Sequence, residues 1–131
     1  MPPPLILVCD DSKSVAHSIS VLLEREEYRV LIATNALECI SVARRERPAL
    51  ILMDVMMPGI DGAAAAELMR HTPEFADTPL VLVSALPEEE VRARAEECGA
   101  AGYLAKPFTR ATLLEAVKRH VAAPDRGIRP A

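Results

Sequence analysis

The sequence predicts one three-layer α/β domain built on a parallel sheet, and three observations support this prediction. Short apolar runs alternate along the chain with longer segments in which apolar residues recur at helical spacing. The apolar runs are mostly continuous, as in strands that are covered on both faces of a parallel sheet. Five such strand–helix pairs follow one another, and 131 residues are the length of one domain. Right-handed crossovers are therefore expected between successive strands.

Each expected element can be placed in order along the chain. The strands are residues 5–8, 28–32, 50–53, 80–83 and 102–105. The helices that follow them carry apolar stripes, three or four residues apart, within 15–23, 36–43, 63–69, 91–98 and 113–121. Gly99 stands after the fourth helix, where a glycine that ends a helix belongs. Residues 124–131 show no periodicity, so the domain is expected to span residues 1–123 and to continue into a flexible tail or linker.

The composition argues against several classes of function. Half of the residues are hydrophobic, which is enough for a core that needs no metal or disulfide. A net charge of -4 argues against binding to nucleic-acid phosphates, and the absence of Trp argues against base stacking. No apolar run approaches the roughly 20 residues of a membrane span. Cys9, Cys39 and Cys98 have neither disulfide nor zinc spacing and are expected in the core, which fits a reducing cytoplasm.

Polar side chains stand at the carboxyl ends of four expected strands, where open parallel sheets bind their ligands. Asp10 and Asp11 follow the first strand, Asp54 the third, Ser84 the fourth and Lys106 the fifth. Three carboxylates that converge on one edge repel each other by up to about 4 kcal/mol per pair at ~4 Å. Mg²⁺ prefers oxygen ligands and would relieve this repulsion, and Lys106 adds a fixed positive charge.

Each of these residues also has an ordinary structural explanation. The acids of the first loop, like Ser12 beside them, could cap the helix that follows, because Asp and Ser are favoured over Ala there by about 1 kcal/mol. Asp54 could begin a turn, Ser84 could cap the fourth helix, and Lys106 could be a solvated surface lysine. None of these explanations requires three acids at one edge of a sheet, so the residues taken together favour a functional site.

The chemistry favoured by this set of groups is phosphoryl transfer. A carboxylate beside Mg²⁺, with an ammonium and a hydroxyl in reach, is suited to attack a phosphoryl group. The metal and Lys106 would share the charge of the phosphoryl oxygens, and Ser84 could donate to one of them. Asp54 is the expected acceptor, because it follows the middle strand and has acids on one side and Ser84 and Lys106 on the other. The expected product is an aspartyl phosphate.

The same residues resemble the receiver domain of two-component response regulators, the chemotaxis regulators among them. The resemblance covers about residues 4–122 and implies the flavodoxin-like doubly wound fold, a five-stranded parallel sheet with strand order 2-1-3-4-5. Its motifs are Asp10–Asp11, Asp54 followed by Met57–Pro58–Gly59–Ile60–Asp61–Gly62, Ser84–Ala85, and Tyr103 three residues before Lys106–Pro107–Phe108.

The resemblance also implies a role for each site residue. A sensor histidine kinase or a phosphotransfer protein would phosphorylate Asp54. Asp11, Asp54 and the backbone carbonyl of Met56 would bind Mg²⁺ directly, and Asp10 would reach it through water. Lys106 would pair with the phosphoryl group, and the peptide bond that follows it is usually cis in the family.

The implied switch involves Ser84, which moves toward the phosphoryl group, and Tyr103, which turns inward behind it. The fourth helix, fifth strand and fifth helix would signal to a protein target or a fused output domain, with a phosphorylation-dependent dimer as one form of output. We expect a signalling protein rather than an enzyme, limited to self-catalysed phosphoryl transfer and slow autodephosphorylation. A stand-alone protein is favoured, and a receiver cut from a longer regulator is the alternative.

Three other functions are weighed against this one. A phosphohydrolase of the haloacid dehalogenase type needs a second Asp two residues after its nucleophile, but positions 12 and 56 are Ser and Met. A flavin-binding protein needs a first loop rich in Ser, Thr and Gly, which the two acids do not provide. A pseudo-receiver that is never phosphorylated would be an interaction module only, and the complete set of site residues argues against it.

Met56 and Leu86 are mild departures from the family, in which polar residues often occupy these positions. Both are expected to flank the site, where apolar side chains could hinder an attacking water, and this predicts a long-lived aspartyl phosphate. His17, His71 and His120 have no partner at metal-binding spacing and are expected at the surface.

Overall fold

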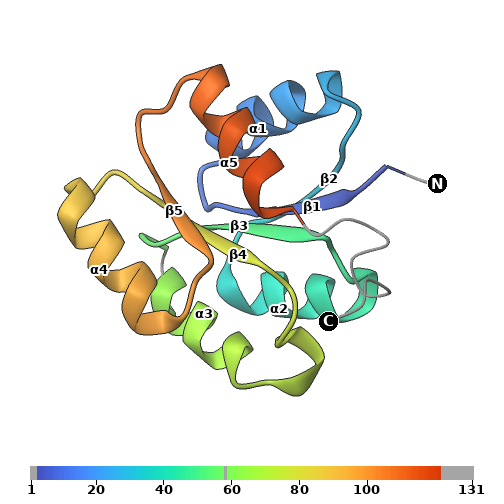
Figure 1. Ribbon diagram of the computed structural model, residues 1–131. Coiled ribbons are helices and arrows are strands. Elements are labelled where there is room, and N and C mark those ends of the chain that lie inside the picture. The colour runs from blue at the N-terminus through green and yellow to red at the C-terminus, as the bar shows by residue number, and fades with distance from the viewer. Residues whose placement is uncertain (1–2, 58, 122–131) are drawn as a thin grey trace.

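The computed structural model describes residues 3–57 and 59–121 and has the expected three-layer architecture (Figure 1). The expected tail, residues 124–131, lies outside the described residues. In chain order the elements are β1 Leu5–Cys9, α1 Lys13–Arg25, β2 Arg29–Ala33, α2 Ala36–Glu46, β3 Leu50–Asp54, α3 Gly62–Arg70, the short 3₁₀ helix η1 Pro73–Phe75, β4 Leu80–Ser84, α4 Glu88–Cys98, β5 Gly102–Ala105 and α5 Arg110–His120.

The five strands form one parallel sheet in the order β2-β1-β3-β4-β5, the order that the resemblance implies. The fold is therefore the flavodoxin-like doubly wound fold. At the carboxyl edge Asp54 lies in register with Val83, and Ser84 lies in register with Ala105. This register brings the residues at the carboxyl ends of β1, β3, β4 and β5 to the same edge of the sheet.

Helices cover both faces of the sheet, with α1 and α5 on one face and α2, α3 and α4 on the other (Figure 1). The side chains of β1 show this division, because Ile6 and Val8 belong to the core under α1 and α5. Leu7 and Cys9 alternate with them and belong to the core under the other three helices. The strands are thus buried on both faces, as their continuous apolar sequences predict.

Local sequence signals set most helix ends. Ser12, Asn35, Asp61 and Thr109 cap the N-termini of α1, α2, α3 and α5 with side-chain oxygens. Gly99 ends α4 in the left-handed conformation, with a φ of 77°, as predicted. The first turn of α4 follows Pro87 and has no side-chain cap, so the alternative in which Ser84 caps this helix is wrong.

Several features differ from the expectation. β1, β3 and β4 each end one residue later than expected, so Asp54 and Ser84 are the last residues of β3 and β4. β2 begins at Arg29 rather than at residue 28, and it is an edge strand, which leaves Ile32 38% exposed. The short helix η1 has no counterpart in the prediction, because three residues are too few to show a period. His120 is half-buried rather than at the surface, since its ring lies against the backbone of Gly102. His17 and His71 are exposed as expected.

α3 begins directly against the end of β3. The N–H of Gly62 donates to the carbonyl oxygen of Val55 at 2.9 Å. A Cβ at position 62 would overlap the backbone carbonyl oxygen of Asp54. The close approach of helix and strand therefore requires glycine here.

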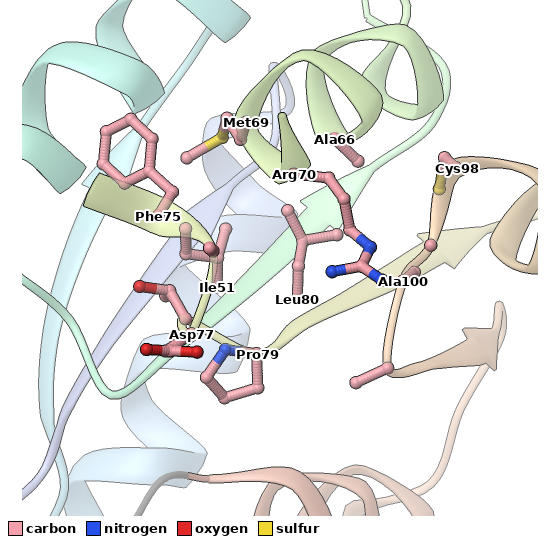
Figure 2. A pocket seen from close by; sticks show the side chains of 14 residues that line it. Ile51, Ala66, Met69, Arg70, Phe75, Asp77, Pro79, Leu80, Cys98 and Ala100 are labelled. Carbon is pink, nitrogen blue, oxygen red and sulfur yellow. The ribbon is translucent and has the colours of Figure 1, made fainter. Parts of the chain in front are cut away.

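A pocket of about 280 Å³ lies at the opposite, amino edge of the sheet (Figure 2). It is bounded by α3, η1, the start of β4 and the end of α4. Within the part of the chain that the structure describes, no helix is both long and apolar enough to cross a membrane.

Candidate functional site

Three acidic side chains meet at the carboxyl edge of the sheet. Asp10 follows β1 and Asp11 comes next in the loop, while Asp54 is the last residue of β3. One carboxylate oxygen of each lies within 4.8 Å of the others. Asp10 and Asp54 are only 2% and 5% exposed, whereas Asp11 is exposed at the rim. The structure thus brings together the three acids that follow two different strands.

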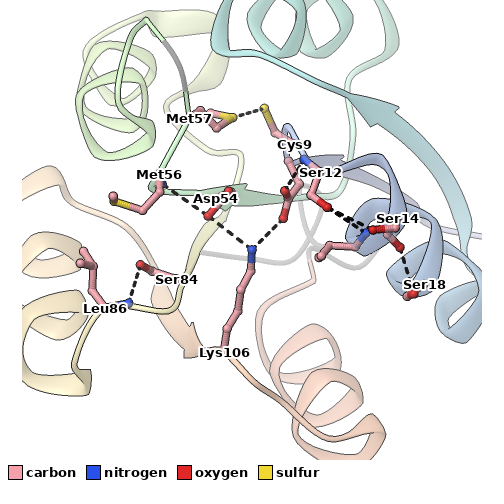
Figure 3. Close-up of polar contacts among 12 residues, drawn as sticks. Cys9, Ser12, Ser14, Ser18, Asp54, Met56, Met57, Ser84, Leu86 and Lys106 are labelled. Carbon is pink, nitrogen blue, oxygen red and sulfur yellow. Dashed lines mark hydrogen bonds and ion pairs between the residues drawn. The ribbon is translucent and has the colours of Figure 1, made fainter.

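Lys106 reaches this acidic cluster from the end of β5 (Figure 3). Its Nζ lies 2.9 Å from Oδ2 of Asp10 and 3.5 Å from Oδ1 of Asp54. The side chain is 20% exposed, so it is not a solvated surface lysine. Its backbone N–H donates to the carbonyl oxygen of Ser84 at 2.7 Å, and its peptide bond to Pro107 is cis.

The acidic cluster holds more negative than positive charge. Three carboxylates lie around one ammonium, so two negative charges are unbalanced. Burial raises the pKa of Asp54 to about 6; the ammonium of Lys106 opposes this rise, and the charge of Asp10 adds to it. One divalent cation with oxygen ligands would restore neutrality, and Mg²⁺ is such a cation. The residues present therefore fit Mg²⁺.

Backbone donors fix the two buried acids in place (Figure 3). The N–H of Ser12 donates to Oδ1 of Asp10 at 2.9 Å, and the N–H of Met56 donates to Oδ1 of Asp54 at 3.4 Å. The N–H of Asp10 itself donates to the carbonyl oxygen of Ala33 at 3.0 Å. The ordinary explanations are thus partly correct, since Ser12 caps α1 and Asp54 begins a turn. Asp54 begins this turn without leaving the acidic cluster.

The hydroxyls of Ser84 and Tyr103 form hydrogen bonds with groups outside the acidic cluster. Ser84 is fully buried, and its Oγ accepts a hydrogen bond from the N–H of Leu86 at 3.1 Å. The hydroxyl of Tyr103, a half-buried side chain, donates to Oε2 of Glu88 at 3.0 Å. Across residues 3–57 and 59–121, no side-chain hydrogen bond joins Ser84 or Tyr103 to the acids. The structure thus does not join these two hydroxyls to the acidic cluster by hydrogen bonds.

Two neighbouring contacts were not anticipated from the sequence. Asp61 caps α3 and also forms an ion pair with Arg94 of α4. Nη1 of Arg94 lies 2.8 Å from Oδ2 of Asp61. The Asp–Gly pair at 61–62 could have indicated the cap, but nothing local indicates a partner 33 residues away. Cys9 lies behind the acids with its Sγ 3.6 Å from Sδ of Met57. Contact with Cys39 and burial raise the pKa of the Cys9 thiol, so it is not a competing nucleophile.

A family model and known proteins are similar to this chain over most of its length. A family model described as the response regulator receiver domain matches residues 6–118. Protein PilH of Pseudomonas aeruginosa is 32% identical over 117 residues, which are 89% of this chain and 97% of PilH. Protein PilG of the same bacterium is 30% identical over 88% of this chain and 86% of its own length.

A solved structure is also similar to this chain over most of its length. The chemotaxis protein CheY4 of Vibrio cholerae superposes with a TM-score of 0.85 and 28% sequence identity, over 91% of this chain and 99% of that protein. The parallel sheet with its 2-1-3-4-5 order, the acids at its carboxyl edge and these similarities agree. The chain belongs to the family of response regulator receiver domains.

Proposed function

We propose that this receiver accepts a phosphoryl group on Asp54 from a phosphohistidine, with Mg²⁺ bound at the acidic cluster. The donor is a sensor histidine kinase or a phosphotransfer protein. The observation that supports this most strongly is the burial of Asp54 beside two further carboxylates and Lys106. Membership of a family of signalling domains supports the same conclusion.

In the proposed reaction, a carboxylate oxygen of Asp54 attacks phosphorus. The new O–P bond forms as the N–P bond to the donor imidazole breaks, and the imidazole nitrogen takes a proton from solvent. Lys106 holds a phosphoryl oxygen with the ammonium that now lies 3.5 Å from Asp54. The hydroxyl of Ser84 donates a hydrogen bond to another oxygen, since accepting the N–H of Leu86 leaves its O–H free to donate.

Asp11, Asp54 and the backbone carbonyl of Met56 hold Mg²⁺ directly in this proposal, and Asp10 holds it through water. When bound, Mg²⁺ supplies positive charge for the phosphoryl oxygens. The ion pair between Lys106 and Asp10 supports the more distant role of Asp10, because one of its oxygens is already engaged at 2.9 Å.

The mass of the intact protein after incubation with Mg²⁺ and acetyl phosphate tests the proposal. The wild type should gain one phosphoryl group, and hydroxylamine should remove it because the bond is an acyl phosphate. Asp54→Asn should gain none, whereas Asp77→Asn, which changes an exposed acid next to the pocket at the amino edge, should behave as wild type. Lys106→Met should slow the gain by about 10²-fold, as for the loss of one electrostatic partner of a transferred group.

Three outcomes would contradict the proposal. A phosphoryl group that persists in Asp54→Asn would place the reaction on another residue. No gain in the wild type would favour the pseudo-receiver, a module that only binds partners. Continuous phosphate release from p-nitrophenyl phosphate would instead indicate a phosphohydrolase.

The phosphorylated state is proposed to be long-lived. The side chain of Met56 is 58% exposed beside the acceptor strand, and Leu86 is half-buried in the loop that contacts Ser84. Apolar groups at these positions restrict a water that attacks the aspartyl phosphate. Met56→Asn and Leu86→Glu should therefore lose the phosphoryl group faster than wild type in a mass-resolved time course, and unchanged rates would contradict this.

The surface of α4, β5 and α5 is proposed to pass the signal to a protein target, a fused output domain or a second copy. Its exposed first turn of α4 is acidic, with Glu88, Glu89 and Glu90, and Tyr103 is hydrogen-bonded to that turn. Amide NMR shifts on phosphorylation should concentrate on these three elements as well as on the acidic cluster. Shifts confined to the cluster would contradict this output surface.

A further inference from the structure

The pocket at the amino edge of the sheet lies away from the acidic cluster and is lined by residues that the proposed phosphoryl chemistry does not use. Its volume is about 280 Å³, and its floor is apolar, with the buried side chains of Ile51, Met69 and Leu80 (Figure 2). Ile51 precedes Asp54 by three residues on β3, which places the floor about 10 Å from the acceptor along the strand.

Arg70, the last residue of α3, provides the positive charge of this pocket. Its side chain runs across Gly99, where a Cβ would overlap its Nε. Figure 2 shows the guanidinium between Leu80 and Ala100. Within residues 3–57 and 59–121, no ion pair engages this group, so its N–H donors are available to a ligand.

The position of Arg70 has an ordinary explanation that accounts for only part of the arrangement. A cation at the carboxyl end of α4 is favoured by the helix dipole. This attraction explains the approach of the guanidinium to Gly99, but it does not explain a pocket with an apolar floor beside an unengaged guanidinium. A charged group next to an apolar floor is the arrangement that binds an amphipathic molecule.

We infer that this pocket binds a small monocarboxylate with an apolar body. The guanidinium matches a carboxylate with two parallel hydrogen bonds. The apolar floor disfavours inorganic anions and sugars, which bury no apolar surface. Asp77 on the opposite wall repels a second negative charge. The volume is roughly twice that of a ~150 Å³ cavity that holds benzene, so the ligand has about ten to twelve non-hydrogen atoms.

Amide NMR titrations with phenylacetate and with the neutral, isosteric phenylacetamide test this inference. Phenylacetate should give saturable shifts at Ala66, Leu80 and Ala100, which line the pocket. It should bind about tenfold more tightly than phenylacetamide, as expected for a hydrogen-bonded pair of charges. Arg70→Gln should remove this difference and leave the affinity for phenylacetamide unchanged.

Two further variants control the experiment. Arg25→Gln also removes an exposed arginine from the last turn of a helix, and it should keep the preference for phenylacetate. Ala100→Leu should fill the pocket and weaken both ligands. Equal affinity of the wild type for the two ligands, an unchanged preference in Arg70→Gln, or shifts that spread over the surface without saturation would overturn the inference. The titrations use no phosphoryl donor, so their failure is separate from a failure of the proposed function.

Discussion

At the acidic cluster, a single lysine lies among three carboxylates. Lys106 contacts Asp10 at 2.9 Å and Asp54 at 3.5 Å, and all three side chains are largely buried. Removing one member of a buried group of charges is costly when it leaves an opposite charge without a partner, and favourable when it removes an excess charge. Individual substitutions at this cluster should therefore change stability in opposite directions.

Asp54→Asn is expected to stabilise the metal-free protein at neutral pH. Burial raises the pKa of Asp54 to about 6, so its ionisation costs more in the folded than in the unfolded chain. Stability is therefore lost as the pH rises from the unfolded pKa of about 3.9 through the folded pKa. Asn keeps the size of the side chain without the charge, so the free energy of unfolding should rise by about 1–3 kcal/mol. Urea denaturation with a chelator measures it, and Asp77→Asn should change it by less than about 0.5 kcal/mol. A less stable Asp54→Asn would contradict the charge argument.

His120 is expected to make the fold less stable in weak acid. Desolvation lowers the pKa of His120, and the adjacent Arg119 adds to this effect. The folded protein then binds the proton less readily than the unfolded chain, so stability falls as the pH drops below the unfolded pKa of about 6.5. The urea midpoint should decrease more between about pH 8 and about pH 5.5 in the wild type than in His120→Gln. The control is His17→Gln, which replaces an exposed histidine in the same way. Equal decreases in the wild type, His120→Gln and His17→Gln would contradict the prediction.

At the junction of β3 and α3, position 62 has no room for a side chain larger than that of glycine. Gly62→Ala should destabilise the protein by about 1–3 kcal/mol, because its Cβ must displace the backbone of Asp54. It should also slow phosphorylation of Asp54, measured by intact mass. Gly59→Ala is the matched control, since Gly59 has a φ of 82° but no atom near its missing Cβ. That variant should cost about 1 kcal/mol through strain alone and leave the phosphorylation rate unchanged. Equal rates in the two variants would contradict this role of the junction.

The elements were predictable to the extent that they have a local signal. The strands and helices follow from apolar periodicity, and the caps Ser12 and Asn35 stand where cap residues are expected. β2 lies one residue later in the chain than expected, because an edge strand buries less of its sequence and its apolar run does not mark its ends. η1 depends on the packing of Phe75 into the core, which no periodicity reveals.

For the whole molecule, Mg²⁺ is expected to raise thermal stability because it binds the folded state alone. At ten times its dissociation constant, a ligand of this kind adds about 1.4 kcal/mol to the free energy of unfolding. Asp11→Asn should abolish most of this gain, since Asp11 is an exposed member of the cluster that can be changed without disturbing the core. Melting temperatures with and without Mg²⁺ measure the effect. An equal gain in Asp11→Asn would show that the cation binds elsewhere.

The convergence of the acidic cluster could be predicted because a parallel sheet brings the carboxyl ends of its strands to one edge. Asp54 ends β3, and Asp10 and Lys106 directly follow β1 and β5, so topology alone places them near each other. The sequence could not indicate that Lys106 lies closer to Asp10 than to Asp54, nor that Arg94 pairs with Asp61. Such contacts depend on side-chain conformations and on the angles between packed helices, which have no local sequence signal.

β5 has a consequence for the behaviour of the protein at high concentration. It is an edge strand of only four residues, and the chain leaves it through Lys106 and Pro107. A strand from another molecule would find few free backbone groups there, and then Pro107, which has no N–H to donate. The short length of β5 and the proline that follows it thus help to prevent separate copies from joining their sheets into aggregates.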